Sequence, residues 1–380
     1  MKKKLLALAV AGAFVAPVAM ADSGNVTIYG QVNASVVMAD TGDGAGAASA
    51  SKGTSSTRIS SDQSRIGFKG AEDLGGGMSA VWQIESGINV DGGSGTWASR
   101  NTFVGLSAER WGTAVLGNHD SPYKSATRGY DLFADTVADN RTIMGIVGQS
   151  TNTLDARNPS SLTYTSPDLY NFKVSAQYVA GAEGATVSGQ NKGSNYSLSL
   201  GYAAGPITAT AAMVQIKAGS AGTGTAAAGV LGTVAEDDKI RGLRIGGSYK
   251  QDAVTLNAVY ERIESDIVTV APARADTMRA NTIYVGGKYA FNSSDAVKLA
   301  FTSRGEVGKT PKVANSQMSQ WSLGFDHAMS KRTLVYALCT KLNNNINSSQ
   351  SFANISTAAP VASGSSADPV AVALGVKHSF

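Results

Sequence analysis

The last eleven residues, 370–380, read VAVALGVKHSF and contain the pattern that decides the fold. The larger apolar side chains recur at every second position from Val370 to Val376 and again at Phe380, with alanine, glycine, lysine and serine between them. Successive side chains of a β-strand point to opposite faces, so this alternation predicts a strand with one apolar face.

Residues 25–37 have the same character near the other end of the chain. Val26, Ile28 and Val36 share one face, and polar residues such as Gln31 and Asn33 share the other. A soluble β-sandwich also alternates in this way, so alternation alone does not distinguish a sandwich from a membrane barrel.

The lengths of the connections make that distinction. With 43 Gly and 9 Pro, the composition is that of an all-β chain with many turns. Short connections such as Gln251–Asp252 alternate strictly with long polar ones such as 218–239 and 343–368, which is typical of outer-membrane barrels. We therefore expect an all-β fold, a 16-stranded antiparallel transmembrane β-barrel. Its strands are predicted at 25–37, 58–70, 77–88, 100–109, 113–119, 158–166, 171–181, 194–204, 206–217, 240–250, 253–263, 280–291, 295–304, 317–328, 331–342 and 369–380.

The first 21 residues have the composition of a cleaved signal peptide. Three lysines precede an apolar run from Leu5 to Ala16, and Ala19-Met20-Ala21 has the form of a signal-peptidase site. The expected organisation is a signal peptide at 1–21 and one barrel domain at 22–380. Removal of the leader leaves 29 basic and 28 acidic residues, a formal charge of +1, which does not indicate a nucleic-acid partner.

Several motifs carry a family resemblance beyond composition. Residues 64–78 (SRIGFKGAEDLGGGM), 100–106 (RNTFVGL) with 111–113 (WGT), 329–333 (MSKRT) and 375–380 (GVKHSF) occur in family order along the chain. In this respect the chain resembles the trimeric general porins of Gram-negative outer membranes, particularly the betaproteobacterial type. The resemblance implies an outer-membrane channel for passive diffusion of small hydrophilic solutes and ions. It also implies a homotrimer surrounded by outer-membrane lipid and lipopolysaccharide, with Phe380 as part of the signal read by the outer-membrane insertion machinery.

The resemblance further implies that the third external loop, about 119–156, folds inward and narrows the channel. This loop carries Asp131, Asp135 and Asp139 at four-residue intervals, a spacing that would suit one face of a short helical turn. Arg65, Arg100 and Arg157 are carried over from the family motifs to the facing wall. Arg65 and Lys69 also lie opposite Ile66 and Phe68 in strand parity, which predicts an inward position because a charge facing lipid costs about 2–4 kcal/mol at the midplane. The expected pore constriction comprises Arg65, Lys69, Arg100, Arg157, Asp131, Asp135 and Asp139.

One position departs from the family pattern. The family often has arginine where this chain has Asn118, and a wall lacking that charge would favour anions less. The sequence leaves open whether the channel prefers anions or cations.

Other function classes have weaker support. A solute-specific channel with a binding site in the lumen is the alternative within the channel class, and an adhesin or structural barrel is a third reading. An enzyme is not indicated, because the three histidines form no metal-binding or catalytic pattern and no G-x-S-x-G motif occurs. We accordingly expect no catalytic, cofactor-binding or metal-binding residues.

Overall fold

The computed structural model describes residues 26–44, 53–146, 154–180, 193–217, 239–265, 278–308, 314–352 and 366–380. The predicted signal peptide lies outside the described residues. No helix in the described ranges is long and apolar enough to cross a bilayer.

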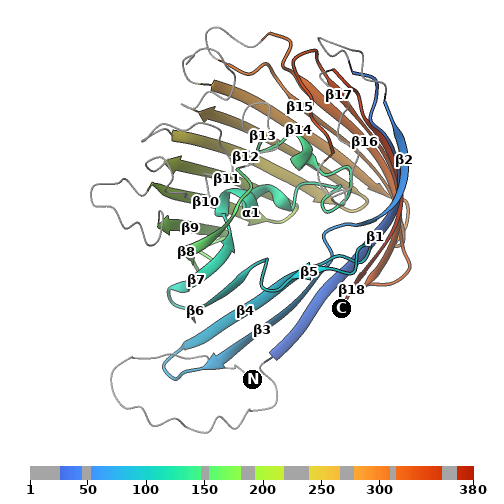
Figure 1. The fold of residues 1–380 in the computed structure, drawn as a ribbon. Coiled ribbons are helices and arrows are strands. Elements are labelled where there is room, and N and C mark those ends of the chain that lie inside the picture. The colour runs from blue at the N-terminus through green and yellow to red at the C-terminus, as the bar shows by residue number, and fades with distance from the viewer. Residues whose placement is uncertain are drawn as a thin grey trace.

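Antiparallel strands make up most of the described chain (Figure 1). They are β1 (Val26–Asp40), β2 (Ser55–Ser61), β3 (Arg65–Asp73), β4 (Met78–Ile88), β5 (Gly95–Thr96), β6 (Thr102–Ala108), β7 (Gly112–Asp120), β8 (Arg157–Thr165), β9 (Phe172–Ala180), β10 (Ser194–Ala204), β11 (Ile207–Lys217), β12 (Lys239–Gln251), β13 (Val254–Ser265), β14 (Met278–Ala290), β15 (Asp295–Arg304), β16 (Met318–Ala328), β17 (Thr333–Asn344) and β18 (Val370–Ser379). Two short helices, α1 (Pro122–Arg128) and the 3-10 helix η1 (Asn140–Thr142), lie between β7 and β8.

These segments form a closed barrel of sixteen strands, as predicted. The first strand pairs with the last over ten residues, from Gln31 opposite Ser379 to Asp40 opposite Val370, so the sheet has no free edge at this seam. β2 and β3 both pair with β1 and are two halves of one barrel strand. β5 is a two-residue addition that pairs only with the end of β4, so eighteen segments make sixteen barrel strands.

The second barrel strand, predicted to be continuous over 58–70, is interrupted between β2 and β3. Gln63 has a φ of 59°, in the left-handed region, and there the ladder cannot continue. The hydroxyl of Ser64 replaces the missing ladder contacts, since it accepts from the Asn33 amide and donates to the Asn33 carbonyl, both at 2.9 Å. At the same break, the backbone carbonyl of Gln63 accepts hydrogen bonds from the side chains of Gln31 and Arg65.

The two faces of the sheet differ as the alternation predicts. On β1 the side chains of Gln31, Asn33 and Ser35 are buried inside the barrel, whereas Val36 and Met38 are 44% and 46% exposed on the outside. Outward apolar exposure of this kind suits contact with lipid, and an inward polar face suits contact with water.

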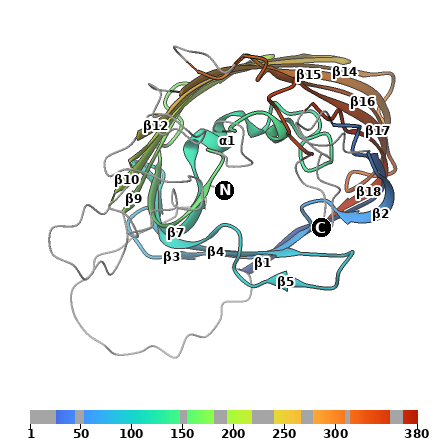
Figure 2. The same ribbon diagram turned by 45° about the horizontal axis from the view of Figure 1, so that its top comes forward.

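The inner face is apolar where the chain between β7 and β8 packs against it. A buried cluster joins Phe133 and other residues of that connection to the inner wall. The wall side of the cluster includes Val37, Tyr336, Leu338 and inward alanines of β18. A second cluster joins Tyr123 of α1 to inward side chains of β11, β12 and β13. Figure 2 shows α1 and the chain after it within the ring of strands.

Candidate pore constriction

The connection between β7 and β8 starts with a well-defined helix. Ser121 caps α1, its hydroxyl accepting from the Lys124 amide at 3.2 Å, and Pro122 occupies the first turn, where its missing N–H is not needed. The helix is short and ends at Gly129. It places Tyr123 toward β12 and β13, where the side chain is completely buried.

A buried ion-pair cluster fixes this helix to the inner wall. Arg244 of β12 pairs with Asp155 and with Glu261 of β13, both at 2.6 Å, and all three side chains are almost fully buried. The Tyr123 hydroxyl donates to Glu261 at 2.7 Å, and the Arg244 guanidinium lies 4.3 Å from the centre of the Tyr123 ring. The Gly145 amide donates to the other oxygen of Glu261 at 2.7 Å, so one carboxylate holds two points of the connection.

Further contacts hold residues 130–133 against the strands that follow. Asn257 of β13 donates to the Tyr130 carbonyl at 2.7 Å, and the Leu132 amide donates to the Tyr284 hydroxyl of β14 at 3.0 Å. The Phe133 ring packs over Gly324, where a Cβ atom would come within 2.8 Å of the ring. A side chain at position 324 would therefore displace this part of the connection.

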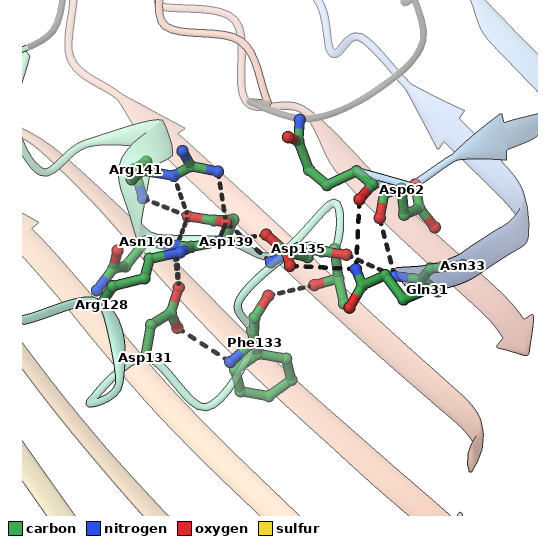
Figure 3. Close-up of polar contacts among 12 residues, drawn as sticks. Gln31, Asn33, Asp62, Arg128, Asp131, Phe133, Asp135, Asp139, Asn140 and Arg141 are labelled. Carbon is green, nitrogen blue, oxygen red and sulfur yellow. Dashed lines mark hydrogen bonds and ion pairs between the residues drawn. The ribbon is translucent and has the colours of Figure 1, made fainter. Parts of the chain in front are cut away.

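The three aspartates of the predicted constriction converge on one guanidinium. Arg128, the last residue of α1, lies 3.5 Å from Asp131, 2.8 Å from Asp135 and 2.5 Å from Asp139 (Figure 3). Arg141 also pairs with Asp139, at 3.2 Å. Asp131 accepts the backbone amides of Phe133 and Asn140, at 2.9 Å and 3.0 Å.

The prediction that these aspartates share one face of a helical turn was wrong. The chain between α1 and η1 is not helical, and Asp135 has a φ of 60°, in the left-handed region. The carboxylates instead accept backbone amides and surround Arg128, which stabilises a compact irregular turn. Asp131 and Asp139 are buried within this turn, and their side chains are only 1% and 0% exposed.

Asp135 connects this turn to the strand wall. Its carboxylate lies 3.1 Å from Arg65 of β3 and accepts from the Gln31 side chain at 3.3 Å. The Asn33 side chain donates to the Asp135 backbone carbonyl at 2.9 Å (Figure 3). Arg65 and Asp135 are the one pair of predicted constriction residues from opposite sides that the described structure brings into contact.

The remaining predicted basic residues have other partners. Arg100 pairs with Glu85 at 2.5 Å and donates to the Gln63 side chain at 3.2 Å. Arg157 pairs with Asp120 at 3.0 Å, and the Lys69 ammonium lies 5.2 Å from the centre of the Tyr29 ring. The arginines therefore lie on the inner wall with local acids beside them.

Asn118, the position that departs from the family pattern, lies next to this wall. Its side-chain amide donates to the Arg100 carbonyl at 3.0 Å. The structure therefore places this position beside the backbone of Arg100 and not in contact with the acidic turn.

Burial and neighbouring charges separate the acidities of the three aspartates. Burial, together with repulsion from Asp139, raises the pKa of Asp131 to about 7. Burial also opposes ionisation of Asp139 and Asp135, but the adjacent guanidinium groups outweigh it. Arg128 and Arg141 hold the pKa of Asp139 far below its usual range, and Arg128 and Arg65 lower the pKa of Asp135.

Acidification through neutral pH is therefore expected to make this region more positive. Arg65, Arg128 and Arg141 face three carboxylates, so the group is neutral when Asp131 is ionised and carries +1 when Asp131 is protonated. The reversal potential in a salt gradient should shift toward anions between about pH 8 and about pH 6. Asp131→Asn should abolish this shift, and a variant that keeps the full shift would show that another group titrates.

Sequence reasoning missed the residues that anchor the connection. Arg128, Arg141, Arg244 and Glu261 belong to no motif, and the partners of Arg244 are 17 and 89 positions away along the chain. One signal was present for Arg244, because its parity in β12 places it on the same inward face as Ile240, which is fully buried.

Comparisons with known proteins agree with this architecture. The Gram-negative porin family model matches residues 7–347. The major outer membrane protein P.IA of Neisseria meningitidis serogroup B (strain MC58) is 34% identical over 196 residues, 47% of each chain, so the match spans about half the length of that relative. The outer membrane porin protein 32 of Delftia acidovorans is 28% identical over 352 residues, 90% of each chain.

A solved structure shows the same fold. The anion-selective porin from Comamonas acidovorans superposes with a TM-score of 0.72 at 21% identity, covering 93% of this chain and 99% of that one. Together with a closed sixteen-stranded barrel, a family match over most of the sequence shows that the chain belongs to the Gram-negative porin family.

Proposed function

We propose that this protein is an outer-membrane porin that lets small hydrophilic solutes and ions diffuse passively through its lumen. The observation that carries the proposal is the difference between the two faces of the closed barrel: the inward side chains are largely polar or charged, and the outward ones are largely apolar. A sixteen-stranded barrel of this kind is wide enough to hold an aqueous channel. Residues 121–146, fixed to the inner wall, form its constriction, with Arg65 and Asp135 at the contact between turn and wall.

We further propose a moderate preference for anions. The three aspartates of the turn are balanced by Arg128 and Arg141 of the same connection together with Arg65 of the wall, so this group contributes little net negative charge. On the neighbouring wall, Lys288 and Lys298 share a single acid, Asp326, at 3.6 Å and 2.8 Å. Lys377 of β18 lies on the same rung as Asn33, whose side chain faces the lumen, and adds another cation. The Comamonas relative is named as anion-selective.

Single-channel recording of the purified protein in planar lipid bilayers tests both proposals. We expect stepwise open channels whose conductance rises in proportion to salt concentration and whose reversal potential in a salt gradient has the sign of anion preference. A silent barrel would contradict the channel, and a conductance that saturates with one solute would point instead to a solute-specific channel.

The remaining partner proposals rest on surface features. A homotrimer is supported by the extension around β5 (Figure 2). Two apolar side chains of this extension, Trp97 and Val90, are 67% and 48% exposed. Recognition by the insertion machinery is supported by Phe380, which exchanges two backbone hydrogen bonds with Gly30 at the seam of the barrel. Contact with outer-membrane lipid and lipopolysaccharide is supported by the outward apolar face.

A further inference from the structure

The outer surface of β11–β14 carries a band of cations at the end of the barrel where the long connections leave. A rung here is a row of residues that lie opposite one another on neighbouring strands. The rung nearest this end pairs Lys217 with Lys239, and the next outward-facing rung contains Gln215, Arg241, Glu264 and Arg279. Arg262 lies one rung lower, beside Leu243. These side chains share a face with Met213, Ile245 and Leu256, each at least 50% exposed, and therefore point out of the barrel. Among the described outward residues of these three rungs, five are cations and one is an acid.

The acid holds two of these cations side by side. Arg262 donates to Oε1 of Glu264 at 2.7 Å, and Arg279 of the neighbouring strand donates to the same oxygen at 2.8 Å. The guanidinium side chains remain 38% and 31% exposed. Two guanidinium groups fixed next to each other present several donors to one anion, and the planar fork of arginine fits a phosphate group well.

The same strands become apolar below the cations. The next rung places Ile245, Tyr260 and Ile283 on the outer face, and the rung after it places Ala209, Gly247, Ala258 and Val285 there. The small residues of the latter rung form the floor of a groove of about 830 Å³, which Tyr249, Phe301 and Trp321 help to line. Ala258 precedes Arg262 by four residues of one strand, so the groove begins roughly 13 Å below the cations.

From this arrangement we propose that the outer face of β11–β14 binds a phosphorylated, acylated lipid of the outer leaflet. The phosphate lies against Arg262 and Arg279, and an acyl chain lies in the groove over Ala258. Charge complementarity selects the head group, since cations at the edge of a membrane barrel are favoured next to anionic lipid. The vertical order of cations, aromatic side chain and groove matches the order of phosphate and hydrocarbon in such a lipid. This inference rests on the proposed outer-membrane location.

Native mass spectrometry of the detergent-purified protein with added lipid A tests the site. We expect wild type to retain lipid A and to bind dephosphorylated lipid A more weakly. Arg262→Gln/Arg279→Gln should weaken binding roughly tenfold through the lost charge-assisted hydrogen bonds. Ala258→Phe, which fills the groove and leaves the charges intact, should also reduce retention.

Lys331→Gln/Arg332→Gln is the matched control, because it removes two exposed cations at the opposite end of the barrel. Equal losses in both double variants would show non-specific attraction and overturn the proposal, as would wild-type binding by Arg262→Gln/Arg279→Gln. Dissociation of an oligomer in that variant would identify the band as a subunit interface and also overturn it. Channel recording in phosphatidylcholine bilayers keeps the two proposals separate: open channels without lipid A binding contradict the lipid site alone, and silent protein contradicts the porin function.

Discussion

Arg244→Met is expected to lower the free energy of unfolding by about 3–5 kcal/mol and to loosen the constriction. The substitution leaves the buried carboxylates of Asp155 and Glu261 without the guanidinium that pairs with both of them. Methionine keeps much of the apolar length of arginine, so the loss is mainly electrostatic. Because Glu261 also holds Tyr123 and Gly145, the whole connection between β7 and β8 should become less firmly attached.

Two measurements check this expectation. Guanidinium unfolding of the detergent-solubilised protein should show the lower stability, and single-channel recording should show a larger and noisier conductance. Arg241→Met is the control, since Arg241 belongs to the same strand but points outward and is exposed. It should leave both quantities close to wild type. Unchanged stability and conductance in Arg244→Met would show that the cluster does not hold the constriction in place.

The sequence predicts the barrel well because the relevant signals are local. Alternation of apolar and polar residues identifies the two faces of each strand, and the number of residues in each connection can be counted from the sequence. The inward direction of Arg65 follows from the parity of its neighbours alone, and the structure places its side chain against Asp135.

The packing of the connection between β7 and β8 could not be predicted in the same way, because the contacts that fix it are not local. The regular spacing of Asp131, Asp135 and Asp139 suggested a helix, yet the carboxylates meet because all three bind Arg128. The spacing of residues along the chain indicates which of them could lie on one face of a helix. It does not indicate which cation they bind when the chain is not helical.

The sequence did contain one sign of where the connection between β7 and β8 packs against the inner wall. Residues 36–39 read VVMA, so both faces of β1 are apolar at that point, although a lumen wall should alternate. Val37 is completely buried there, in the same cluster as Phe133. An interruption of polar alternation on the inner face therefore marks where an internal segment packs.

The contact between Arg65 and Asp135 is expected to have the largest effect on ion preference. The two side chains are 24% and 16% exposed, so each charge acts on ions in the lumen more directly than the buried Asp131 or Asp139 does. A unit charge about 4 Å from an ion in water contributes about 1 kcal/mol, roughly a fivefold change in relative permeability, and more where the local dielectric is lower. Arg65→Ala should shift the reversal potential toward cations, and Asp135→Asn should shift it toward anions.

The opposite signs of these shifts distinguish electrostatics from a change of shape. Loosening of the turn alone would move both variants in one direction and would raise conductance in both. Arg332→Ala, which removes a cation from an exposed turn between β16 and β17, controls for the total charge of the protein and should leave the reversal potential unchanged. Unaltered reversal potentials in both Arg65→Ala and Asp135→Asn would mean that ions do not sense this pair. The Lys288, Lys298 and Lys377 wall would then have to carry the anion preference.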